Sequence, residues 1–152
     1  MLQGWHTLHR SEEGLFQIPI DSLAIKHIED TWPNKFKDQL HNLKLSIAID
    51  GVNWPYSQTE ITYIVWTVLV INNNTPPWLS IKNEHIMSDI IGPGQRQMKN
   101  MDVYLQPLIK ESKELWEGLH AYDVSTPIPS ERSFTLYGIC AYTTHDYLRL
   151  GV

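Results

Sequence analysis

The most constraining feature of this sequence is residues 43–51, which read Leu-Lys-Leu-Ser-Ile-Ala-Ile-Asp-Gly, with aliphatic residues alternating with small or polar ones. A period of two predicts a β-strand with one apolar face, and Ser46 and Ala48 are small enough for a second layer to pack on the other. The strand ends with a carboxylate, Asp50, where a sheet can hold a catalytic or metal-binding acid in one geometry. The alternative, which the local sequence favours, is that Asp50 and Gly51 form a turn.

The composition predicts one folded domain. The chain has 152 residues, 42% of them hydrophobic, with six Trp and seven Tyr, which suffices to bury a core. The formal net charge of −5 argues against strong nucleic-acid binding by this chain alone, because such binding needs clustered Lys and Arg. We expect residues 1–16 to be poorly ordered and residues 17–152 to form the domain.

The sequence shows no targeting or membrane segment. The N-terminus lacks a basic start followed by an apolar core, and the longest apolar run, residues 64–71, is too short to span a bilayer. The single cysteine, Cys140, excludes an internal disulfide and fits a reducing compartment, so we expect a nuclear or cytoplasmic protein without membrane contact.

Periodicity predicts the order helix, three strands, helix, strand. Asp21 can cap a helix over residues 22–31, which Pro33 stops. The other predicted elements are a short helix over 34–40, strands over 61–71 and 85–91, a brief extended piece over 78–81, a long amphipathic helix after Asn100, a loop over 121–131 and a fourth strand over 133–143, for which a helix is also possible.

This order predicts which strands become neighbours. Three successive strands can form a meander, and the long helix can then cross over so that the fourth strand lies parallel to the first. Asp50 follows the first strand and Asp146 follows the fourth. Because neighbouring strands lie about 4.8 Å apart, the two acids would be neighbours.

Several motifs match one known family. The most specific is residues 101–109, Met-Asp-Val-Tyr-Leu-Gln-Pro-Leu-Ile, and weaker matches occupy residues 19–24, 26–27, 45–53, 66, 68–70, 76–79, 92–94, 114–117 and 143–147. From about residue 17 to the end, the chain resembles the transposase of plant CACTA (En/Spm-type) DNA transposons. That resemblance implies a ribonuclease H-like α/β fold with a mixed sheet, and an enzyme that cuts and rejoins DNA with three acidic residues.

The resemblance assigns Asp50 and Asp146 as the first two acids of a DDE/DDD-type site. It implies that they hold Mg²⁺ or Mn²⁺, since such chemistry uses two divalent metals about 3.5–4 Å apart. The family continues past the second acid with a cysteine-rich segment and a third acid, and these 152 residues contain neither. We therefore expect a truncated domain that lacks strand transfer, with weak or no DNA binding of its own.

Two smaller departures from the family also stand out. Tyr147 is followed by Leu148, where the family has proline after an aromatic residue. Asp89 falls in a predicted strand where the family is apolar, and a charge there costs stability unless it reaches water or a partner.

Other interpretations remain open. The chain could be a non-catalytic interaction protein that pairs with a full-length transposase or with itself through an exposed fourth strand, or an unrelated small enzyme using Asp50 with a histidine. Asp102 competes with Asp146 as a family acid, although an acid at a helix start also favours the helix dipole. His145 is either a metal or phosphate ligand or an exposed loop residue. His6 and His9 could share a metal only with further ligands.

Overall fold

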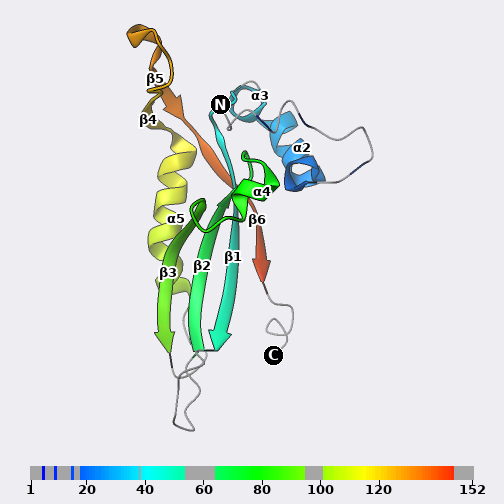
Figure 1. Cartoon of the computed structure of the whole chain (residues 1–152), viewed down its shortest axis with the longest axis vertical. Helices are drawn as coiled ribbons and strands as arrows, with labels where there is room; N and C mark the ends of the chain where they lie inside the picture. Colours follow the sequence, from blue (N-terminus) through cyan, green and yellow to red (C-terminus); the bar gives the residue numbers. More distant parts are fainter. Residues whose placement is uncertain are drawn as a thin grey trace.

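The computed structural model describes residues 18–37, 39–53, 64–94 and 101–145, together with Trp5, His9 and Leu15. For residues 52–53, 64–65, 88–94, 101, 131 and 145 it describes the backbone alone. The chain has an α/β fold built on a four-stranded mixed sheet, with helix α5 lying along one face of the sheet (Figure 1). This architecture confirms the predicted fold class and is consistent with a partial ribonuclease H-like fold.

The sheet has the strand order β3-β2-β1-β6. Strands β1 (Leu43–Asn53), β2 (Ile64–Asn72) and β3 (Ile86–Gly94) form an antiparallel meander. Helix α5 (Met101–Glu117) then crosses over, and β6 (Gly138–His145) pairs with β1 in parallel. The predicted crossover, which brings the first and last strands side by side, is thus confirmed (Figure 1).

Helix α5 packs on the sheet through an apolar stripe. Leu108 and Leu105 contact the side chains that β1 and β2 present on one face, namely Leu45, Ile47, Ile49, Val68 and Val70. We call this side the α5 face of the sheet. The helix ends at Gly118, whose φ of 111° lies in the left-handed region that glycine adopts without strain.

A second core joins the N-terminal helices to the start of β6. The 3₁₀ turn η1 (Pro19–Asp21) leads into α2 (Leu23–Thr31) and α3 (Pro33–Phe36). Their buried side chains are Ile20, Ile25, Ile28 and Phe36, and Trp116, Ile139 and Ala141 pack against them.

The cap of α2 differs from the prediction by one residue. The Ser22 side chain accepts the amide of Ile25 at 3.3 Å, so Ser22 caps α2. Asp21 instead accepts the amide of Ile18 at 3.2 Å within the preceding turn. Pro33 does not stop helical structure but begins α3, because the first position of a helix needs no amide donor.

Three predicted segments differ in the structure. Helix α4 (Pro77–Ser80) replaces the extended piece, because Pro77 at its first position favours a helical turn. The predicted fourth strand is two strands, since β5 (Ser133–Leu136) ends before β6 begins. The predicted loop contains β4 (Leu119–Tyr122), which pairs with β5 as a hairpin.

Gly138, the first residue of β6, lies in close contact with α5. A Cβ atom at Gly138 would collide with the Leu115 side chain of α5. The glycine therefore lets α5 lie against the start of β6.

In β3, Asp89 falls at a register shift, between Ser88, which pairs with Leu69, and Ile90, which pairs with Val68. A bulge of this kind leaves Asp89 without a cross-strand partner.

Candidate functional site

Asp50 lies inside β1 and not in a turn. The β1 ladder pairs Asp50 with Thr67 and Gly51 with Trp66, and the strand continues to Asn53. The turn that the local sequence favours is therefore wrong, because cross-strand pairing with β2 extends past the glycine. Trp66 is 7% exposed, and an aromatic side chain opposite a glycine supplies packing that the glycine lacks.

The side chain of Asp50 lies on the sheet face opposite α5. Successive side chains of a strand point to opposite faces, and Ile47 and Ile49 contact α5. Lys44, Ser46, Ala48 and Asp50 therefore share the other side, which we call the second face. Lys44 confirms this assignment, because its Nζ lies 2.6 Å from Glu29 Oε1 of α2.

The second face is closed at one end of β1 and open at the other. Side-chain exposure is 2% for Lys44 and 4% for its partner Glu29. Ser46 is also buried, Ala48 is half-buried and Asp50 is exposed. We call the part around Lys44 and Ser46 the closed end, and the part around Ala48 and Asp50 the open end.

A buried polar network fills the closed end. Asn74 Oδ1 accepts the amide of Lys44 at 2.8 Å, and Asn74 Nδ2 donates to the Asn42 carbonyl at 2.7 Å. The hydroxyls of Ser46 and Tyr142 both lie near Asn73 Oδ1, at 3.4 and 3.2 Å. This network connects β1, the turn after β2 and β6, so it fixes the sheet that carries Asp50.

Strand β6 runs beside Asp50 up to the last described residue. Its register pairs Ala48 with Thr144 and Ile49 with His145, after a bulge between Leu45 and Ser46. Asp146, the predicted second acid, lies outside the described residues, and only the backbone of His145 is described. The last described pair is Ile49 with His145, and in sequence Asp50 follows Ile49 and Asp146 follows His145.

Asp50 fits a hard divalent cation as a single ligand. Its carboxylate is exposed and makes no hydrogen bond or ion pair with a described residue, and Mg²⁺ and Mn²⁺ prefer such oxygen ligands. Within the described part of the chain, no three His, Cys, Asp or Glu side chains gather into a metal site.

The other predicted candidates lie elsewhere. Asp102 is exposed in the first turn of α5, where an acid favours the helix dipole. His9 stacks on Trp5 with ring centroids 4.6 Å apart, and its Nδ1 lies 3.1 Å from the Trp5 carbonyl oxygen. His6, the other half of the proposed histidine pair, lies outside the described residues.

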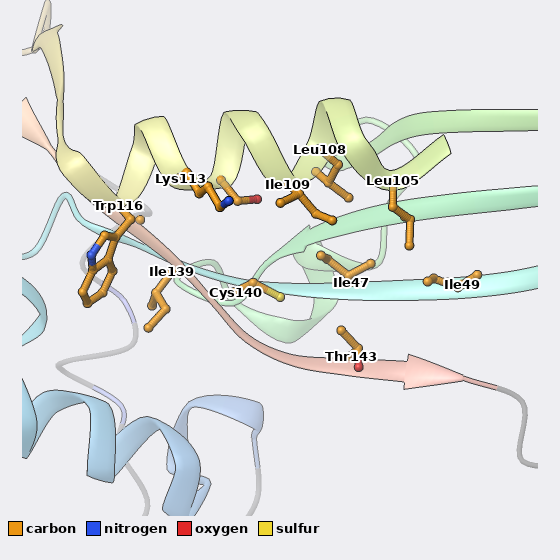
Figure 2. Close-up of a pocket in the computed structure, with 12 residues that line it drawn as sticks. Ile47, Ile49, Leu105, Leu108, Ile109, Lys113, Trp116, Ile139, Cys140 and Thr143 are labelled. Atoms are coloured by element: carbon orange, nitrogen blue, oxygen red, sulfur yellow. The ribbon is translucent and has the colours of Figure 1, made fainter. Parts of the chain in front are cut away.

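A cavity of about 470 Å³ lies between α5 and strands β1 and β6 (Figure 2). Asp50 is not among the residues that line it. No carboxylate lines it, so it offers a metal no acidic ligand. Cys140 lines this cavity, and burial raises the pKa of its thiol. The thiol therefore stays protonated at neutral pH, as a packing residue would. The remaining lining residues are Ile47, Ile49, Leu105, Leu108, Ile109, Ser112, Lys113, Trp116, Gly138, Ile139 and Thr143.

Sequence reasoning missed two hydroxyl residues beside Asp50. Thr67 is its partner on β2, and Thr144 is exposed on β6, where it pairs with Ala48. The signal that finds them is strand register, because no motif assigns a role to either residue. In the described part of the chain, no helix has the length and apolar character needed to cross a membrane.

Comparison with known proteins gives one result at the level of the family. Residues 13–152 match the model of the transposase family tnp2. No curated protein and no solved structure matches the chain. Because the family model covers nearly the whole sequence, the chain belongs to the tnp2 transposase family.

Proposed function

We propose that this chain provides two metal-binding acids, Asp50 and Asp146, of a DNA transposase of the plant CACTA (En/Spm) type. The reaction of such an enzyme is metal-dependent phosphodiester cleavage followed by strand transfer. Membership of the tnp2 family supports the reaction class. The motifs around residues 101–109 and 45–53 support the CACTA type.

The observation that carries the proposal is the parallel pairing of β1 and β6. Its last described pair is Ile49 with His145. If the same register continues by one residue, Asp146 becomes the partner of Asp50 on an adjacent strand. Partners on neighbouring strands share a face, so both carboxylates would lie on the open end of the second face.

The residues of the chain would bind and orient, while the metal supplies the reactivity. Divalent cations held by carboxylates activate the attacking oxygen and stabilise the leaving oxygen of a phosphodiester. Asp50 would hold its ligand oxygens in place because β1 is paired on both sides, with β2 and with β6. Asp146 would close the site from β6.

A titration of the purified chain with Mn²⁺, followed by electron paramagnetic resonance, tests this assignment. Asp50→Asn and Asp146→Asn should each weaken binding more than about tenfold, since each removes a ligand. Asp102→Asn is the matched control, because it removes an exposed acid from α5. Equal binding by wild type and Asp50→Asn would contradict the proposal and favour the alternative, a non-catalytic protein that pairs with a transposase.

Thermal unfolding in excess chelator gives a second readout. Two adjacent carboxylates repel each other when no cation lies between them. Either Asp50→Asn or Asp146→Asn should then raise the melting temperature of the metal-free chain above that of the metal-free wild type. Addition of Mn²⁺ should raise the melting temperature of the wild type and leave that of each variant unchanged. A melting temperature that Mn²⁺ leaves unchanged in the wild type would count against a shared site.

A further inference from the structure

The open end of the second face carries two hydroxyl side chains, one on each side of β1. Thr67 lies on β2 opposite Asp50, and Thr144 lies on β6 opposite Ala48. Both belong to the second face, because Val68 and Thr143, their neighbours in sequence, contact the α5 side. The two hydroxyls therefore flank β1 at the strand segment that carries Asp50.

Among the described residues, the side chains in this area are small or exposed. The side chain of Thr144 is exposed, and its hydroxyl makes no hydrogen bond with a described residue. Ala48, between the two threonine strands, projects only a methyl group. Lys44 and Glu29 close the other end of this face, and Lys44 precedes Ala48 on β1.

The hydroxyl of Thr67 is only weakly engaged. Its Oγ1 donates to the carbonyl oxygen of Asp50 at 3.4 Å, well beyond the 2.7–2.8 Å typical of hydroxyl donors. A rotation about χ1 therefore frees this donor for a stronger acceptor at little cost. A phosphate oxygen is such an acceptor, because hydrogen bonds to charged groups are shorter and stronger than neutral ones.

We propose that Thr67 and Thr144 are positioning residues that donate hydrogen bonds to phosphate oxygens of the DNA strand being cut. This inference rests on the proposed function, since Asp50 marks where the reacting phosphodiester lies. Threonine hydroxyls commonly fix the register of a protein on the DNA backbone without reading sequence. Neutral hydroxyl donors also suit a chain with a net charge of −5, because it has few Lys and Arg side chains to pair with phosphates.

Binding of a 20-base-pair DNA duplex in Ca²⁺, measured by fluorescence anisotropy, tests the proposal with the full chain. Thr67→Val and Thr144→Val keep the β-branched shape and remove the donor, so each should weaken binding about tenfold. Thr67→Ser and Thr144→Ser should restore most of the affinity. Thr135→Val, which alters an exposed threonine on the β4–β5 hairpin, is the matched control and should bind like wild type.

The dependence of affinity on salt separates positioning from a general loss of charge. A neutral hydroxyl releases no counterion, so the slope of log Kd against log salt should stay unchanged in both valine variants. Unchanged affinity in both valine variants, failure of serine to rescue, or a wild-type chain without Ca²⁺-dependent DNA binding would each overturn the proposal.

The metal assignment and the hydroxyl assignment fail in different ways. If Asp50→Asn leaves Mn²⁺ binding unchanged while Thr67→Val weakens DNA binding, the hydroxyl contacts stand and the metal site is wrong. If Asp50→Asn abolishes Mn²⁺ binding while both valine variants bind DNA normally, the metal site stands and the hydroxyl contacts are wrong.

Discussion

The two ends of the second face differ in whether a charged side chain is buried and paired or exposed and unpaired. At the closed end, Lys44 is 2% exposed and its Nζ lies 2.6 Å from Glu29. At the open end, six residues further along the same strand, Asp50 is exposed and has no described ionic partner. A buried charge must be paired to be tolerated, whereas an exposed acid on a rigid strand remains available to a ligand.

The largest effect should come from breaking the pair at the closed end. Lys44→Met leaves the Glu29 carboxylate buried without its cation, and we expect unfolding to become easier by about 3–5 kcal/mol. Urea denaturation measures this change. The double variant Lys44→Met/Glu29→Leu should regain most of the loss, because neither charge then remains buried. A single variant as stable as wild type would show that the pair is not what closes this end.

The next effect should come from Asn74, which is 1% exposed and holds the same end together through its side-chain amide. Asn74→Ala leaves the amide of Lys44 and the carbonyl of Asn42 without that partner. We expect a loss of about 2–3 kcal/mol in unfolding free energy, since each unsatisfied buried group costs about 1–3 kcal/mol. Faster hydrogen exchange at the Lys44 amide would confirm the cause. Exchange at the wild-type rate would contradict it.

Removing the charge at the open end should change stability little. Asp50→Asn in chelator should lower the unfolding free energy by no more than about 0.5 kcal/mol, because exposed positions contribute little to stability, and relieved repulsion with Asp146 should raise it. The same urea experiment provides the comparison with Lys44→Met. A loss of several kcal/mol would mean that Asp50 is a structural residue, and the contrast between the two ends would disappear.

The smallest effect concerns Asp123 in the β4–β5 hairpin, away from both ends. Hydrogen bonds from Ser125 and Thr126, with the nearby His41, lower the pKa of Asp123 from 3.8 to about 2. A depressed pKa stabilises the folded state above pH 3.8, and this contribution is lost as the pH falls through about 2. The amide of Ser125, followed by NMR, should titrate near pH 2. A midpoint near 3.8 would show that these hydrogen bonds do not form in solution.

The sequence predicts the sheet well where periodicity and topology agree. The alternation in residues 43–51, the apolar β2 and the amphipathic α5 suffice to predict the meander and the crossover. Division of the last strand was not predicted, because the apolar run over residues 133–143 continues through the break at Tyr137. The β4–β5 hairpin was also missed, since two strands of four residues each give too short a pattern.

The candidate site divides in the same way. Asp50 was found from its place on a strand, although the local preference of Asp-Gly for a turn pointed elsewhere and cross-strand pairing prevailed. Thr67 and the Lys44–Glu29 pair depend on which strand and helix lie opposite β1, so no local pattern indicates them. Asp146 stays a prediction, supported by the β6 register up to His145.

The central claim is that Asp50 and Asp146 share one cation on adjacent strands. Anomalous diffraction from a crystal of the chain grown with Mn²⁺ tests it most directly. We predict a Mn²⁺ peak within bonding distance of carboxylate oxygens from both residues, on the sheet face away from α5. A peak bound by only one of them, or well-ordered carboxylates that point to different sides of the sheet, would contradict it.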